Sequence, residues 1–121
     1  MKTNREVEGY LPLTPALFHV LLALADGGKH GYAILKDIEF RTQAEVRIGT
    51  GTLYGIIKRL LTEGLIEEFK KRPVMDRDDQ RRIYYRLTPL GRQVAMAEAE
   101  RHEKVLALAR VKNVIPGPEP I

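Results

Sequence analysis

The chain has 121 residues, a length that suits one small domain with a modest core. Lysine and arginine number 20 against 16 acidic residues, so the net charge is +4 and the isoelectric point is near 9.5, a balance that favours anionic partners without requiring them. The absence of cysteine excludes disulfides and thiol chemistry, and no apolar segment resembles a secretion signal or a membrane span, so we expect a soluble, cytoplasmic protein.

Two helices are predicted in the N-terminal third. The first follows the start signals Thr14 and Pro15, stops at the glycine pair 27–28, and has apolar residues at helical spacing, namely Leu13, Leu17, Val20, Leu21 and Leu24. The second occupies HGYAILKDIEFR and ends near Arg41. The alternation of apolar and charged residues over 45–48 then predicts a very short strand.

A third helix is predicted from GTGTLYGIIKRLLTEG, residues 49–64. Its apolar residues form one stripe, made of Leu53, Ile56, Ile57, Leu60 and Leu61, while the opposite face carries Gly51, Gly55, Lys58 and Thr62, with Tyr54 and Arg59 beside them. Glycine inside a helix costs about 0.5–1 kcal/mol relative to alanine, so something approaches closely at Gly55. That partner is either an external molecule or a neighbouring helix.

The glycines before this helix do not have the spacing of a nucleotide-binding loop, because neither G-x-G-x-x-G nor G-x-x-x-x-G-K-[ST] is present. A helix start with free amides still attracts anions, and residues 49–52 are therefore expected to receive an anionic group such as a phosphate. Thr50 and Thr52 are alternatively ordinary residues of a first helical turn.

A basic hairpin and a long helix complete the chain. Strands are predicted at 65–69 and 82–87, joined by the charged loop KKRPVMDRDDQ, and a helix is predicted from the cap Thr88 and Pro89 to about 111. The order of elements is that of a winged helix-turn-helix, so the expected fold is mainly α with a small antiparallel β-wing. We expect a DNA-binding domain with an N-terminal helix at 1–87, a dimerisation helix at 88–112 and a flexible tail at 113–121.

The sequence offers no constellation typical of an enzyme. Its acidic residues lie in charge-mixed stretches, and His19, His30 and His102 are far apart in the chain, so no catalytic residue, metal or cofactor is expected.

Three segments resemble the PadR family of transcriptional regulators: LTPALFHVLLALADGGKHGYAI, IGTGTLYGIIKRLLTEGLIEE and RRIYYRLTPLGRQVA. Together they span about residues 11–110. The resemblance implies a dimeric winged-helix protein, often a repressor, of the short type that closes with a single C-terminal helix. One departure is Thr50, where the family often has proline.

The resemblance also implies a DNA interface, because it places the G-T-L-Y segment and the H-G-Y segment at the DNA. The expected DNA-binding residues are Thr50, Gly51, Thr52, Tyr54, Lys58 and Arg59 of the third helix, His30 and Tyr32 before the second, and Lys71, Arg72 and Arg77 of the wing. Tyr32 is alternatively a core residue.

Dimerisation is expected to involve the last helix. Leu90, Val94, Ala97, Leu108 and Val111 lie near a heptad-spaced seam, but Arg101 and Lys104 interrupt it. The first helix should therefore add partner surface through Leu11, Leu17 and Leu21. The predicted function is a homodimeric repressor that binds a palindromic site in double-stranded DNA, and release by a small-molecule effector is the expected form of control. The family includes members that respond to small aromatic or cationic compounds, but this sequence shows no residue set that would form the pocket. The alternative is a protein-interaction or ligand-sensing module without a specific DNA site.

Overall fold

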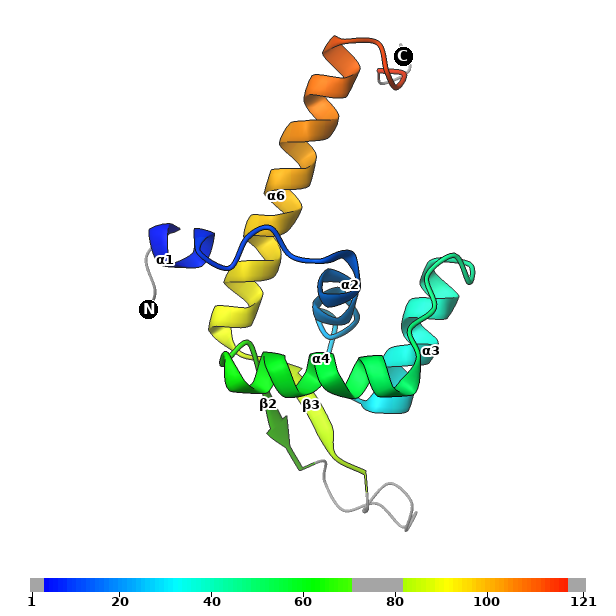
Figure 1. Cartoon of the computed structure of the whole chain (residues 1–121), viewed down its shortest axis with the longest axis vertical. Helices are drawn as coiled ribbons and strands as arrows, with labels where there is room; N and C mark the ends of the chain where they lie inside the picture. The colour runs from blue at the N-terminus through cyan, green and yellow to red at the C-terminus, as the bar shows by residue number, and fades with distance from the viewer. Residues whose placement is uncertain (1–3, 71–81, 118–121) are drawn as a thin grey trace.

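The computed structural model describes residues 4–70 and 82–117. Its elements follow in the order α1 (Asn4–Glu8), α2 (Pro15–Ala23), β1 (Lys29–His30), α3 (Gly31–Arg41), α4 (Thr50–Thr62), β2 (Ile66–Phe69), β3 (Tyr84–Leu87) and α6 (Pro89–Val111). Figure 1 shows α2, α3 and α4 gathered into one body, with the β2–β3 hairpin on one side of it and the second half of α6 projecting from the other. The predicted fold, a winged helix-turn-helix with a long last helix, is confirmed.

Side-chain caps begin the helices where the sequence predicts them. The Thr14 hydroxyl accepts a hydrogen bond from the Leu17 amide at 3.2 Å at the start of α2. The His30 ring does the same for the Ala33 amide at 3.1 Å at the start of α3, and Thr88 for the Gly91 amide at 3.0 Å at the start of α6. These local bonds satisfy backbone donors that no helical carbonyl reaches.

The predicted third helix is α4, and the residues of its apolar stripe pack into the core. Leu53 and Leu60 are fully buried, and Ile56 and Ile57 are nearly so. The helix ends at Thr62, and Gly64 follows with a φ of 74°, a left-handed conformation that glycine adopts without strain.

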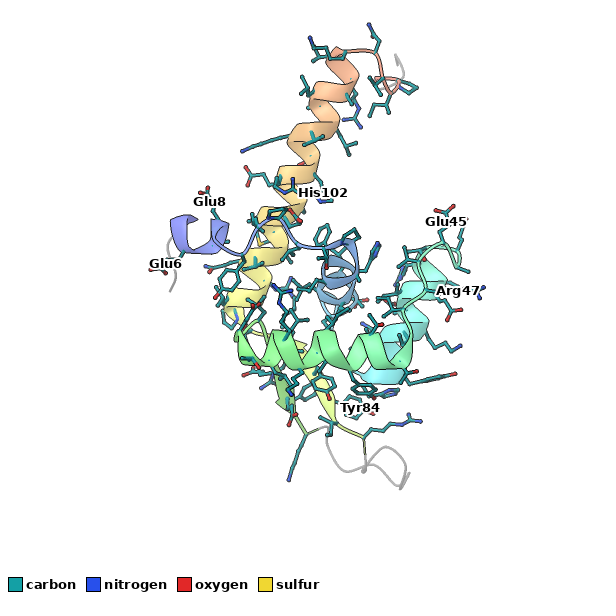
Figure 2. The ribbon with its side chains drawn as sticks, viewed as in Figure 1. Glu6, Glu8, Glu45, Arg47, Tyr84 and His102 are labelled. Atoms are coloured by element: carbon teal, nitrogen blue, oxygen red, sulfur yellow. The ribbon has the colours of Figure 1, made fainter. Side chains whose placement is uncertain are left out.

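The strand predicted at 45–48 is wrong. Those residues form an irregular connection from α3 to α4, where Figure 2 labels Glu45 and Arg47. The Thr42 hydroxyl accepts the Val46 amide at 3.1 Å, and Val46 packs against the core without a neighbouring strand to pair with. The short strand of the fold is instead β1, Lys29–His30.

The three strands form an antiparallel sheet in the order β1-β3-β2. His30 pairs with Tyr84 across β1 and β3, and Phe69 pairs with Tyr84 across β2 and β3. The two predicted hairpin strands are confirmed, but both are shorter than predicted: β2 is Ile66–Phe69 where 65–69 was expected, and β3 is Tyr84–Leu87 where 82–87 was expected. Since β1 runs directly into α3, the sheet fixes the start of α3 against the base of the wing.

The N-terminal segment and α6 are joined by a buried carboxylate. Glu98 of α6 is 0% exposed; it accepts the Leu13 amide at 2.7 Å and Arg101 Nε at 2.5 Å. Arg101 holds the pKa of Glu98 below its usual value, and the Leu13 amide acts in the same direction. Helix α1, which the periodicity does not predict, packs on α6 and buries Val7. These contacts hold the first half of α6 against the N-terminal segment.

Candidate nucleic-acid interface

The exposed face of α4 carries the residues that the helical wheel places opposite the core. Gly51, Gly55, Lys58 and Thr62 are all exposed, and Thr52 beside them is also exposed. The face therefore combines a strip with little side-chain bulk, one ammonium group and threonine hydroxyls, of which that of Thr62 donates to the Lys58 carbonyl at 2.9 Å. Such a surface suits contact with a polar, anionic partner.

The glycines on this face are not explained by packing within the described chain. A Cβ added at Gly51 or at Gly55 would have no atom within 4 Å apart from its own helix and chain neighbours. The alternative that Gly55 packs closely on a neighbouring helix is therefore wrong. Its cost to the helix has no compensating contact in the monomer, which favours an external partner.

The start of α4 presents backbone donors. Its N-cap is Gly49, which has no side chain to accept a hydrogen bond from the first turn, and Thr50 and Thr52 lie exposed in that turn. The positive end of the helix dipole and uncapped amides together attract an anion.

Tyr54 and Arg59 flank the small-residue strip. Tyr54 is half-exposed, and its phenol lies across the start of α3, where a Cβ added at Gly31 would sit 2.6 Å from the Tyr54 hydroxyl oxygen. A side chain at position 31 would therefore displace the Tyr54 phenol from its present place. Arg59 is exposed and pairs with Glu63 at 3.4 Å, an ion pair open to solvent that contributes little to stability.

The structure decides between the two interpretations of Tyr32. Its side chain is 59% exposed, so the core interpretation is wrong, and the ring carries Lys36 Nζ 5.3 Å from its centroid. His30 lies next to it, with the two rings stacked at 6.5 Å. Tyr32, His30 and Lys36 thus form a cationic and aromatic surface at the start of α3.

The three expected wing residues, Lys71, Arg72 and Arg77, lie outside the described residues. The structure adds Arg82 at the base of the wing, where its Nη1 lies 3.0 Å from His30 Nε2. The sequence places Arg82 only at the start of the second predicted hairpin strand, and nothing local reveals that it meets His30. Burial raises the pKa of the nearby Tyr85 phenol, and the Glu68 carboxylate adds to the effect, so Tyr85 stays protonated at neutral pH.

The residues expected at a dimer contact fall into three groups. Leu17, Leu21 and Val94 are buried in the core of their own chain, so they offer no surface to a partner. Leu11, Leu90 and Ala97 are partly buried against that core. Leu108 and Val111 are 57% and 75% exposed on the projecting half of α6.

Other kinds of site find no support in the described structure. Within 4–70 and 82–117, no three acidic or histidine side chains gather where they would hold a metal ion. None of the helices in those ranges is both long enough and apolar enough to cross a bilayer.

Two sequence relatives match the chain over most of its length. An uncharacterised 37.1 kDa protein of transposon TN4556 from Streptomyces fradiae is 42% identical over 80 residues, which cover 66% of this chain and 21% of that protein. Uncharacterised protein X of Lysinibacillus sphaericus is 31% identical over 96 residues, covering 79% of this chain and 80% of the relative. The chain thus spans about a fifth of the Streptomyces protein.

Solved structures of regulators share the fold. A transcriptional regulator from Clostridium thermocellum is 26% identical at a TM-score of 0.65, covering 97% of this chain and 100% of that one. BpsR of Bordetella bronchiseptica, whose DNA binding is regulated by 6-hydroxynicotinic acid, is 26% identical at a TM-score of 0.61, covering 96% of this chain and 80% of that one. PadR of Bacillus subtilis, in complex with operator DNA, is 21% identical at a TM-score of 0.63, covering 91% of this chain and 54% of that one.

The family model described as "Transcriptional regulator PadR-like family" matches residues 20–97, from within α2 to the middle of α6. This match covers more than half of the chain and includes β1, the H-G-Y segment, α4 and the described strands of the wing. The chain belongs to the PadR-like family of transcriptional regulators.

Proposed function

We propose that the protein is a sequence-specific DNA-binding repressor that places α4 in the major groove and its wing on the DNA backbone. The observation that carries this proposal is the exposed face of α4, on which two glycines without any packing role lie in line with Lys58 and Thr62. A helix that enters the major groove must present side chains that reach base edges and must let the backbone approach closely.

The charge of this surface supports the same function. Lys58 and Arg59 lie on α4, Lys36 on α3 and Arg82 at the base of the wing, so each of these three elements contributes cationic groups. Phosphate contacts of this kind supply most of the affinity for DNA and fix the register of the reading helix. Lys71, Arg72 and Arg77 are proposed to extend the contact along the wing.

The comparisons supply two further reasons. The fold is shared with a PadR that binds operator DNA, and with a BpsR whose DNA binding is regulated by 6-hydroxynicotinic acid. We extend both properties to this chain as proposals: DNA is its partner, and a small-molecule effector releases it.

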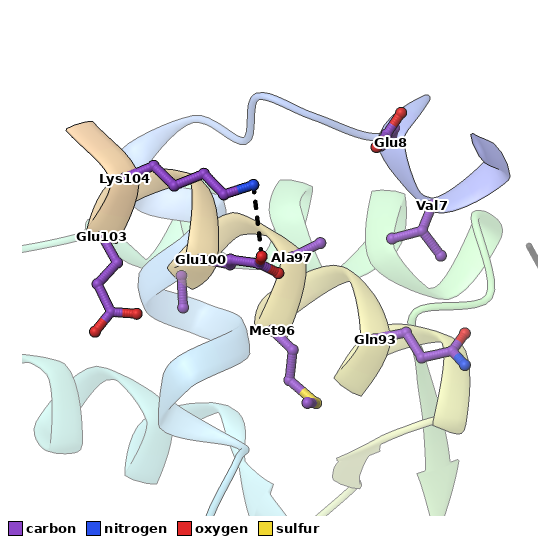
Figure 3. Close-up of a pocket in the computed structure, with 9 residues that line it drawn as sticks. Val7, Glu8, Gln93, Met96, Ala97, Glu100, Glu103 and Lys104 are labelled. Atoms are coloured by element: carbon purple, nitrogen blue, oxygen red, sulfur yellow. Dashed lines mark ion pairs between the residues drawn. The ribbon is translucent and has the colours of Figure 1, made fainter. Parts of the chain in front are cut away.

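A homodimer with twofold symmetry is the proposed assembly. The second half of α6 projects from the body (Figure 1), and its apolar side chains Val105, Leu108 and Val111 are exposed there. A groove of about 710 Å³ lies between α1 and α6, with the Lys104–Glu100 ion pair on one side and Met96 and Val7 within it (Figure 3). A second copy seated on these surfaces would bury the apolar residues and pair two α4 helices with two half-sites of a palindromic operator.

Sedimentation velocity tests the assembly. We expect the wild type to sediment as a dimer, Leu108→Glu to sediment as a monomer with unchanged circular dichroism, and Glu45→Lys to remain dimeric. Glu45 is the control because it is exposed on the connection from α3 to α4, away from α6 (Figure 2). A dimer of unchanged affinity for Leu108→Glu would show that this part of α6 is not the interface.

Fluorescence anisotropy over a salt series tests DNA binding. The probes are a duplex from upstream of the protein's own gene and a scrambled duplex of equal length. We expect tight binding to the first at salt concentrations that release the second, with a log-log slope of about 0.9 per phosphate contact. Absence of binding to either duplex, and to duplexes selected from a random pool, would favour a protein-interaction module instead.

A further inference from the structure

An aromatic side chain lies exposed on the outer face of α3. Phe40 is 78% exposed, the largest exposed fraction of any large apolar side chain within residues 4–70 and 82–117. It continues a stripe that begins with Tyr32 and Lys36 at a spacing of four residues, and all three are exposed. The helical rise places Phe40 about 12 Å along α3 from Tyr32. Phe40 therefore belongs neither to the core nor to the surface at the start of α3.

The Phe40 ring borders a shallow groove of about 500 Å³ at the end of α3, lined by Lys36, Glu39, Phe40, Gln43 and Ala44. Gln43 and Ala44 form a tight turn with φ values of 52° and 63°, a left-handed conformation that is uncommon for residues other than glycine. The Ala44 amide donates a hydrogen bond to the Glu39 carbonyl at 2.7 Å and closes the turn. The groove is thus formed in the free chain, and a partner would not have to order it.

Charges of both signs surround this apolar centre. The Glu39 carboxylate lies 3.8 Å from Lys36 Nζ and 3.8 Å from Arg47 Nε. Both ion pairs are long and open to solvent, so they contribute little to stability and their charges can pair again across a contact. A patch of one sign would favour a partner of the opposite sign. A patch that mixes both signs is instead complemented by an identical patch related to it by a twofold axis.

The position of α3 leaves this face free in the proposed dimer. Figure 1 shows α3 on one side of the body and α1 on the other, with α2 between them. The surfaces proposed to hold the dimer together are the groove between α1 and α6 and the projecting half of α6, and neither includes α3. With two α4 helices in adjacent half-sites, the outer faces of the two α3 helices are expected to point outward along the DNA.

We propose that the Phe40 patch, made of Lys36, Glu39, Phe40, Gln43 and Ala44, docks against the same patch of a second dimer bound at a neighbouring site on the DNA. The inference rests on the DNA-binding function proposed above. The two Phe40 rings pack together at the centre of the contact, and Glu39 of each copy meets Arg47 of the other at its rim.

The size of the patch indicates that this contact forms on DNA and not in free solution. A phenylalanine side chain buries about 150–250 Å², whereas a stable interface buries about 1,000 Å² or more in total. A dimer bound at one site raises the effective concentration of its patch at the next site, so a weak contact is sufficient there. The consequence is cooperative occupation of paired operators.

Four variants test the contact. Phe40→Gln replaces the ring with a polar side chain that favours a helix, and the exposure of Phe40 predicts an unchanged melting temperature. Glu39→Arg reverses the charge at the rim, and Glu39→Arg combined with Arg47→Glu restores opposite charges. Val114→Gln is the matched control, because it removes another strongly exposed apolar side chain beyond the end of α6.

The probe is a duplex that carries one or two copies of a site selected by the wild type from a random pool. The spacer between two copies is lengthened one base pair at a time over one helical turn, about 10 base pairs. We expect the wild type to bind the second site about tenfold more tightly than the first at one spacing, with no gain half a turn away. Phe40→Gln and Glu39→Arg should bind a single site as the wild type does but lose this gain, whereas Val114→Gln and the double variant should keep it.

Three results would overturn this inference while leaving DNA binding in place: no gain for the wild type at any spacing, a full gain for Phe40→Gln, or a double variant that gains no more than Glu39→Arg. The first would leave the Phe40 patch to a different protein, and the second would assign the cooperativity to the DNA itself. A wild type that binds neither the single-site nor the two-site duplex is distinguishable from these, because it would refute the proposed function and this inference with it.

Discussion

Gly55 is expected to weaken the folded state and to strengthen DNA binding, so that substitutions there should change the two properties in opposite directions. The residue lies in the middle of α4, and a Cβ added to it would meet no atom within 4 Å beyond its own helix and chain neighbours. Gly55→Ala should therefore raise the free energy of unfolding by about 0.5–1 kcal/mol, which is the difference in helix propensity alone. In a chain of this size the corresponding rise in melting temperature is about 2–6 °C.

Binding should respond in the other direction. Gly55 lies between Gly51 and Lys58 on the exposed face of α4, which is proposed to approach the DNA closely. Glutamine, like alanine, is a good helix former, but the long side chain introduced by Gly55→Gln would hold α4 away from the groove. We expect it to weaken binding of a selected duplex at least tenfold, or about 1.4 kcal/mol, with stability equal to or above the wild type.

Urea unfolding at fixed protein concentration and anisotropy with one duplex measure these two quantities on the same samples. Destabilisation by Gly55→Ala would show that Gly55 has a packing role in the folded protein and would contradict this prediction. The prediction is refuted equally if Gly55→Gln binds DNA as tightly as the wild type.

Two further predictions concern stability. Glu98→Gln should lower the free energy of unfolding by about 1.5–3 kcal/mol at pH 7, because it weakens the charge-assisted bond from Arg101. The folded-state pKa of Glu98 is lowered, so this stabilisation is fully present above the unfolded-state pKa, about 4.3, and is lost as the pH falls. Urea unfolding below pH 4 should therefore give free energies of unfolding for the wild type and Glu98→Gln that converge. Gly91→Ala should destabilise the folded protein by about 2 kcal/mol or more, because the new Cβ would overlap the Leu65 carbonyl oxygen. Thermal unfolding should show a lower melting temperature for Gly91→Ala and no such fall for the control, Gly51→Ala.

Most of the secondary structure could be predicted from the sequence because its signals are local. Thr14 and Thr88 each precede a proline and cap the helix that follows, and Gly64 ends α4 in the conformation that glycine favours. The face of α4 was predictable for the same reason, since the i, i+3, i+4 spacing of its apolar residues assigns the other positions to the surface.

The errors come from features that depend on distant contacts. β1 has two residues and becomes a strand only through pairing with Tyr84 and Tyr85, whereas the alternation at 45–48 is too short to outweigh the lack of a pairing partner. Leu17, Leu21 and Val94 were expected at a dimer contact because the sequence alone does not show which apolar residues are buried in the core of the single chain. The contact between Arg82 and His30 was not predicted because it exists only in the folded chain.

DNA binding by the exposed face of α4 is tested by the affinity of Lys58→Glu for a duplex selected by the wild type. Lys58 is exposed on that face, so reversing its charge should leave circular dichroism and melting temperature unchanged. We expect at least tenfold weaker binding for Lys58→Glu, with wild-type binding for Arg110→Glu, which makes the same charge change at the far end of α6. Equal affinity of Lys58→Glu and the wild type would contradict the placement of α4 in the groove.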